Sequence, residues 1–181
     1  MSDRTLVEMA SPTMAGIKTG SLFPCRYGDR NAFLEEIRGY NRRLAPRGLV
    51  LIPLKISGGR ALLYLVRPDM LKKDFEDENV RSILNAEGYE CGNLSRCIRH
   101  LKTRLQEERP FPHEIGLFLG YPAEDVKGFI ENQARNYKYI GLWKVYGDVE
   151  SARKTFDRCR NCTRCYGRQM DCGKRLEGLL V

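Results

Sequence analysis

The chain has 181 residues, a formal net charge of +8, 42% hydrophobic residues and 30% charged residues. This composition is that of an ordinary globular protein, and the length suits one domain with a real hydrophobic core. No window approaches the roughly 20 apolar residues of a membrane-spanning helix, so we expect no membrane partner. The positive charge permits anionic partners but does not identify one.

The N-terminal sequence MSDRTLVEMASP has neither the basic start nor the apolar run of a secretory signal. We therefore expect a cytoplasmic protein whose seven cysteines are reduced. The odd number of cysteines also argues against a full disulfide framework.

Residues 11–23 form the first chemically unusual segment, with hydroxyl side chains and one lysine placed around glycines. Bare backbone amides together with such side chains could hold an anion. A Walker-type phosphate loop is excluded, because its Gly-Lys pair and its earlier glycine are missing. The alternative is a polar turn before a helix, since turns favour the same residue types. The candidate anion-binding residues are Thr13, Lys18, Thr19 and Ser21.

A helix capped by Asp29 and ending before Pro46 is predicted next. Two apolar strands then flank Ser57-Gly58-Gly59, a typical hairpin signal, and together they cover residues 49–67. Pro53 cannot donate a ladder hydrogen bond, so the first strand should lie at a sheet edge or carry a bulge.

Helical segments follow the hairpin. Pro68 should open one helix, a second should end near Gly88, and Asn93 should cap a longer helix. The basic face of this longer helix is interpreted as a solvated surface.

Residues 111–148 are the densest run of apolar, aromatic and glycine residues in the chain. A short apolar helical turn should end at Gly120, and a second helix should follow with acidic residues in its first turn. Aromatic and β-branched residues over 138–146 predict a strand.

Asp148 should cap a last long helix that continues into a cysteine-rich tail over residues 159–181. The predicted fold is therefore a single α+β domain over residues 1–181. Its small, mainly antiparallel sheet should combine the hairpin 49–67 with the strand 138–146 and pack with several helices.

The tail has its cysteines at spacings of three, three and seven residues, a pattern that could bind zinc or an iron–sulfur cluster. The spacing matches no standard ligand set. If the last helix continues through the tail, the thiols would lie on one side of it and could pack as small hydrophobic groups. The candidate metal ligands are Cys159, Cys162, Cys165 and Cys172.

His113 and Glu114 precede the short apolar turn and are candidate catalytic residues. A zincin site is excluded, because Leu117 stands where its second histidine is required. The start of a helix favours a neutral imidazole, which can donate, accept or take up a proton. The alternative is a histidine that is hydrogen-bonded to the backbone beside the core.

Four stretches carry a resemblance: residues 11–23, FPHEIGLFLGYP at 111–122, EDVKGFI at 124–130 and WKVYGD at 143–148. With these motifs the chain resembles the bacterial family called domain of unknown function 3793, which is found largely in anaerobes. The resemblance implies no established activity. The family usually has a cysteine where this chain has Ala10, and a glycine where it has Ala134. In the tail, the family shares Cys162 and Tyr166 with this chain.

The leading hypothesis is one pocket in which residues 13–21 and the His113/Glu114 motif meet around a small anionic ligand or cofactor. Lys144 and Tyr146 would lie on its wall. Catalysis is compatible with this arrangement but not required by it.

Two hypotheses from other classes stay open. One is a redox or metal-binding protein that acts through Cys162 and its neighbours. The other is a module that binds nucleic acid or an acidic partner, although no known nucleic-acid-binding motif accompanies its basic residues. Those basic residues are Arg153, Lys154, Arg158, Arg160, Arg164 and Arg168.

Overall fold

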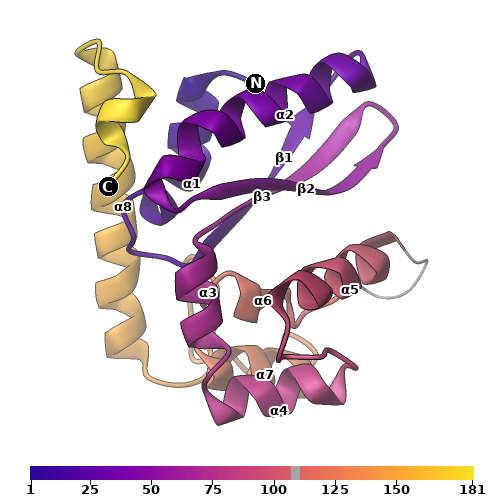
Figure 1. Ribbon diagram of the computed structural model, residues 1–181. Coiled ribbons are helices and arrows are strands. Elements are labelled where there is room, and N and C mark those ends of the chain that lie inside the picture. The colour runs from indigo at the N-terminus through magenta and orange to yellow at the C-terminus, as the bar shows by residue number, and fades with distance from the viewer. Residues whose placement is uncertain (107–110) are drawn as a thin grey trace. The chain divides into compact units, whose positions relative to one another are not determined.

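The computed structural model describes residues 1–106 and 111–181 (Figure 1). Helices make up most of its regular structure, and two small antiparallel sheets accompany them. The α+β class predicted from the sequence is confirmed.

The chain divides into two compact units, which we describe separately. Unit 1 comprises residues 1–69 and 159–181, and unit 2 comprises residues 70–158. The single domain expected from the sequence stays a prediction, because compact units also occur within one domain.

Unit 1 contains a three-stranded antiparallel sheet in the order β1-β3-β2. Pro53 lies in β2, an edge strand, and the pairing register shifts between Pro53 and Lys55. Both features predicted for this proline are thus present. The elements of unit 1 are α1 (Asp3–Met14), β1 (Gly20–Arg26), α2 (Arg30–Leu44), η1 (Ala45–Arg47), β2 (Val50–Ser57), β3 (Arg60–Val66), the second part of α8 (Val149–Asp171) and η2 (Leu176–Leu179).

The core of unit 1 lies between the sheet and its helices. Side chains alternate across a strand, so Ala61, Leu63 and Leu65 of β3 share one face, and all three belong to this core. Figure 1 shows α1 and α2 packed against the sheet. Cys162 and Tyr166 of α8 complete the same core.

The interpretation of residues 11–23 as a polar turn is wrong for much of the segment. Residues up to Met14 belong to α1, whose Ser2 cap accepts a hydrogen bond from the amide of Thr5 at 3.1 Å. Residues from Gly20 form β1, which pairs with β3 along its whole length. Side chains at helical spacing, including Leu6, bury this helix against the core.

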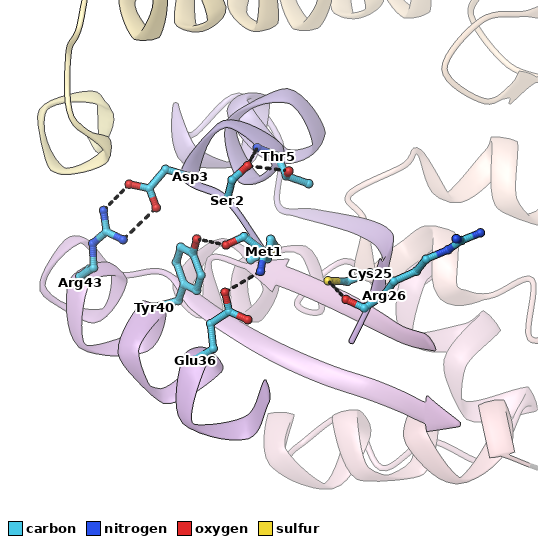
Figure 2. Close-up of polar contacts among 9 residues, drawn as sticks. All are labelled: Met1, Ser2, Asp3, Thr5, Cys25, Arg26, Glu36, Tyr40 and Arg43. Atoms are coloured by element: carbon cyan, nitrogen blue, oxygen red, sulfur yellow. Dashed lines mark hydrogen bonds and ion pairs between the residues drawn. The ribbon is translucent and has the colours of Figure 1, made fainter. Parts of the chain in front are cut away.

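Polar contacts hold the first residues of the chain against α2 (Figure 2). Arg43 donates two hydrogen bonds to the Asp3 carboxylate, at 2.9 and 2.6 Å, and this interaction lowers the pKa of Asp3. The Tyr40 hydroxyl donates to the Met1 carbonyl at 2.9 Å, and Glu36 accepts from the Met1 ammonium at 2.5 Å.

Unit 2 is mainly helical, and the caps predicted for it are present. The Asn93 side chain accepts from the amide of Arg96 at 3.1 Å, and Asp148 accepts from the amides of Glu150 and Ser151 at 2.9 and 3.1 Å. Its elements are α3 (Pro68–Asp74), which begins at the boundary, α4 (Glu78–Ala86), α5 (Leu94–Gln106), α6 (Ile115–Phe118), α7 (Ala123–Glu131), β4 (Tyr139–Ile140), β5 (Lys144–Val145) and the first part of α8. Within the described residues, no helix has the length and apolar character needed to cross a bilayer.

The strand predicted over residues 138–146 is instead a tight hairpin. Strands β4 and β5 have two residues each and form a sheet of their own, separate from the hairpin 49–67. The chain reverses where the Gly141 amide donates to the Trp143 carbonyl at 3.0 Å. The ring of Phe156 occupies the space beside Gly141, which holds the turn against α8.

Candidate functional site

Unit 2 contains a pocket of about 330 Å³ between the start of α6, helix α7 and the β4–β5 hairpin. We call it the aromatic pocket. Its volume lies at the small end of the range for small-molecule sites, and its wall is mainly apolar, as in most such sites. The pocket is lined by Phe111, His113, Ile115, Gly116, Leu119, Tyr121, Asp125, Val126, Phe129, Ile140, Gly141, Leu142, Trp143 and Lys144.

Stacked rings build one wall of the aromatic pocket. Trp143 and Tyr121 stack with centroids 4.6 Å apart, and the rings of Trp143 and Phe156 meet edge to face with centroids 4.4 Å apart. Phe156 is buried and belongs to a small core formed by the hairpin and α8. The rings are therefore held by tertiary packing, since two-residue strands would not order them alone.

Asp125 fixes the hairpin to α7. Its buried carboxylate accepts from the Trp143 indole at 2.7 Å and from the amides of Tyr146 and Gly147 at 2.7 and 2.8 Å. From the sequence, Asp125 was expected only to place a favourable negative charge in the first turn of its helix. Its three hydrogen bonds instead position the aromatic wall.

His113 is exposed at the aromatic pocket. Its ring lies 4.9 Å from the Phe129 centroid and 6.0 Å from that of Phe111. Among the described residues, no hydrogen bond to its ring nitrogens is present, so the backbone-bonded alternative has no support there. A ligand in the aromatic pocket could therefore contact the exposed side chain of His113.

Glu114, next to His113, points into the interior of unit 2. Its buried carboxylate accepts from the Tyr89 hydroxyl at 2.7 Å and lies 3.2 Å from Nη1 of Arg104. Burial and this hydrogen bond raise the pKa of Tyr89. Glu114 is not among the residues that line the aromatic pocket. The two predicted catalytic residues thus lie in different environments, and Glu114 has a structural partner set.

Lys144 is one of the residues that line the aromatic pocket. Its ammonium donates to the Ala134 carbonyl at 2.7 Å and lies 4.8 Å from the Tyr137 ring centroid and 5.8 Å from that of Phe129. Tyr146 is not a lining residue, and its ring packs against α7. Burial raises the pKa of Tyr146, whose hydroxyl has no hydrogen-bond partner among the described residues.

The predicted anion-binding segment, residues 13–21, belongs to unit 1. Thr13, Thr19 and Ser21 are buried, and the hydroxyls of Thr13 and Ser21 hydrogen-bond to each other at 2.8 Å. Lys18 is half-buried, and burial lowers its pKa to about 8, an effect that Cys159 partly offsets. His113 belongs to unit 2, so a pocket shared with these residues stays a prediction.

The tail cysteines differ in their exposure to solvent. Cys159 and Cys162 are buried, whereas Cys165 and Cys172 are exposed. Within residues 1–106 and 111–181, no group of three or more His, Cys, Asp or Glu side chains could hold a metal ion. The geometry thus gives the zinc or iron–sulfur hypothesis no support, and it stays a prediction.

The redox hypothesis depends on the reactivity of Cys162. Burial raises the pKa of this thiol to about 11, and Ser11 lies close enough to hydrogen-bond to it. A nucleophilic thiol needs the opposite shift. The redox role stays a prediction without geometric support.

The basic residues of α8 are exposed. Two of them have partners within unit 2: Arg153 lies 4.7 Å from the Tyr139 ring centroid, and Lys154 lies 3.3 Å from Glu150. Nucleic-acid binding by this helix stays a prediction.

Exposed apolar side chains form a rim around the aromatic pocket, and the sequence did not predict this rim. Phe111, Ile140 and Leu142 line the pocket, yet they are 50%, 55% and 43% exposed. Tyr137, which lies over Lys144, is 41% exposed. The aromatic density of residues 111–148 was the available signal, but it does not show which of these side chains remain exposed.

Comparisons with known proteins agree with the motif resemblance. The model of the family described as "Protein of unknown function (DUF3793)" matches residues 6–180, and the chain belongs to this family. No curated protein and no solved structure matches the chain.

Proposed function

We propose that the aromatic pocket binds one small ligand that has a flat apolar body and an anionic group. The observation that carries this proposal is the pocket of about 330 Å³ with stacked rings on its wall and an exposed apolar rim. Large apolar side chains that stay exposed around a concave site are typical of ligand and partner sites.

The apolar body would lie against the stacked pair Tyr121 and Trp143 and below the rim residues. Aromatic rings prefer offset-stacked or edge-to-face contacts, which an inserted flat ring can make with this wall. Exposed Phe111 and Leu142 would lose contact with water when the ligand binds, and this burial favours binding.

The anionic group would lie near Lys144 and His113. An ammonium has three N–H donors, and the Ala134 carbonyl takes one of those of Lys144. The imidazole of His113 can supply another donor. Asp125, the carboxylate among the described lining residues, already accepts three hydrogen bonds. The proposal therefore keeps the anionic ligand of the sequence hypothesis and places it in unit 2, without Glu114.

Two dyes of the same shape test both parts of the proposal. 1-Anilinonaphthalene-8-sulfonate carries a sulfonate, and N-phenyl-1-naphthylamine has the same ring system without it. Calorimetry with the full chain should show one site for each dye, with the anionic dye binding about fivefold more tightly, as expected for an ion pair of roughly 1 kcal/mol.

Four variants separate the contributions. Leu142→Ser should weaken both dyes several-fold, because it removes part of the apolar rim. Lys144→Met should weaken the anionic dye alone, whereas Lys154→Met, which removes the same charge from an exposed site of unit 2, should change neither. Equal binding by wild type and Leu142→Ser, or equal losses in Leu142→Ser and Met9→Ser, which alters an exposed apolar residue of unit 1, would contradict the proposal.

A further inference from the structure

A second hollow, of about 710 Å³, lies at the C-terminal end of α8 and in the turn that follows it. All of its residues belong to unit 1. We call it the basic hollow, because three cations and no carboxylate line it among the residues that the structure describes. Its lining residues are Asn161, Arg164, Cys165, Arg168, Gln169, Cys172, Gly173 and Lys174.

The two arginines of the basic hollow lie one helical turn apart, which places them on the same face of α8. Both are exposed, and neither makes an ion pair with an acidic residue in the part of the chain that the structure describes. The acidic residue at the end of the helix, Asp171, instead pairs with Arg4 of α1 at 2.6 Å.

The turn after α8 brings the third cation back to the helix. Gly173 has φ +81°, a left-handed conformation that suits glycine. The amide of Lys174 then donates to the Gln169 carbonyl at 3.0 Å, and its ammonium donates to Oε1 of Gln169 at 2.7 Å. Nε2 of Gln169 donates to Sγ of Cys165 at 3.3 Å, so the amide that holds Lys174 is itself oriented.

Compensation of the helix dipole accounts for only part of this charge. The dipole favours cations in the last turn, which includes Arg168, and the adjoining Lys174 benefits similarly. Arg164 lies about two turns before the end at Asp171, beyond the reach of this effect. The basic hollow therefore concentrates more positive charge than the helix end requires.

We propose that the basic hollow binds linked phosphate groups. Guanidinium groups match phosphate oxygens with paired hydrogen bonds, and an ammonium adds a compact charge. Two guanidinium groups on one helix face and a lysine turned back toward them can contact neighbouring phosphates together. This site is independent of the aromatic pocket, which lies in unit 2. The same phosphate chemistry occurs in a free oligophosphate and in a single nucleic-acid strand.

Inorganic tripolyphosphate is the first probe. Calorimetry should show saturable binding to the wild-type chain, and the double variant Arg164→Gln/Arg168→Gln should bind at least about tenfold more weakly, the loss expected when roughly 1.4 kcal/mol is removed. The matched control Arg153→Gln/Lys154→Gln removes the same charge from exposed positions of the same helix in unit 2 and should bind normally. Unchanged binding by the first variant, or equal loss in both variants, would overturn the proposal.

The exposed thiols of the basic hollow give a second readout. Bound tripolyphosphate should slow labelling of Cys165 and Cys172 by N-ethylmaleimide, measured peptide by peptide, and leave the half-buried Cys25 and Cys91 unchanged. Equal labelling of Cys165 and Cys172 with and without a saturating probe would contradict the site. Displacement of tripolyphosphate by a short single-stranded oligonucleotide would identify nucleic acid as the source of the bound phosphates. Failure to displace it would identify a free oligophosphate instead.

Discussion

Residues 13–21 of unit 1 and the aromatic pocket of unit 2 use their side chains in opposite ways. In unit 1, polar side chains are buried: Thr13 and Ser21 are at most 4% exposed and hydrogen-bond to each other. In unit 2, apolar side chains stay exposed: Phe111 and Ile140 are at least 50% exposed beside a cavity. The segment with the more reactive residue types is thus the more internally satisfied one.

This contrast shows that residue type alone does not locate a site. A buried hydroxyl needs a partner, and the partner that Thr13 finds is within its own unit. An apolar ring that remains in contact with water costs free energy, and a ligand can remove that cost. The direction in which a side chain points decides which case applies.

The largest expected effect tests how the β4–β5 hairpin of the aromatic pocket packs on α8. In Gly141→Ala, a Cβ would lie 2.2 Å from the buried ring of Phe156, which must then move together with Trp143. We expect the free energy of unfolding to fall by about 3 kcal/mol, measured by urea unfolding followed by tryptophan fluorescence.

Gly167→Ala is the matched control in α8. Among the described residues, no atom outside its own helix would lie within 4 Å of the added Cβ, so this variant should be stabilised by up to about 1 kcal/mol. If both variants have the same stability, the hairpin does not pack on Phe156 as described.

The next largest effect tests how the aromatic wall is held. Asp125→Asn replaces one carboxylate oxygen by an amide donor, so at least one of the three donors around it loses its partner. We expect a loss of about 2–3 kcal/mol in the free energy of unfolding. Asp148→Asn should cost less than about 0.5 kcal/mol, because asparagine caps a helix as well as aspartate. Equal losses would show that Asp125 is not the fixing residue.

The third prediction concerns the buried polar segment of unit 1. Burial lowers the pKa of Lys18 to about 8, below the value that an unfolded chain gives it. Above about pH 8 the folded chain therefore releases a proton that the unfolded chain still holds, so stability from this group rises with pH. We expect a rise of up to about 2 kcal/mol between about pH 8 and about pH 9.5.

Lys18→Met should remove this rise, and Lys154→Met, at an exposed site, should keep it. Urea unfolding at both pH values measures the difference. A rise that persists in Lys18→Met would mean that another group causes it, which would contradict a buried Lys18 ammonium with a lowered pKa.

The smallest effect concerns the loop that Lys144 contacts. Ala134 has φ +63°, a left-handed conformation that glycine adopts with less strain, and the family resemblance implies a glycine there. Ala134→Gly should stabilise the chain by about 0.5–1 kcal/mol in thermal unfolding. Ala86→Gly, in helix α4, should instead destabilise it by up to about 1 kcal/mol. A loss in both variants would argue against the left-handed loop.

Much of the fold followed from local signals in the sequence. The caps at Asp29, Asn93 and Asp148 and the edge position of Pro53 each depend on one residue and its nearest neighbours. Such features are encoded locally, and the structure confirms them.

The errors came from long-range partners. Residues 20–26 became a strand because β3 pairs with them, although the segment contains Pro24 and no β-branched residue. The strand predicted over 138–146 is a hairpin because Phe156 of α8 packs beside Gly141. Neither partner can be identified from spacing within the segment.

Two residues that line the aromatic pocket were named from the sequence, but the pocket itself was not predicted. Lys144 and His113 were named and do line the aromatic pocket, whereas Glu114 faces Tyr89 and Arg104. Periodicity does not reveal that Phe111 and Leu142 remain exposed, because the same residues would suit a core.

The central claim is that a ligand occupies the aromatic pocket, and one signal reports on it directly. Trp143 is the only tryptophan, so its indole N–H gives a single cross-peak in a nitrogen-15 NMR spectrum. Because this group lies on the pocket wall and donates to Asp125, adding 1-anilinonaphthalene-8-sulfonate should shift the cross-peak saturably, with the affinity found by calorimetry. A cross-peak that stays in place while the dye binds would contradict the account.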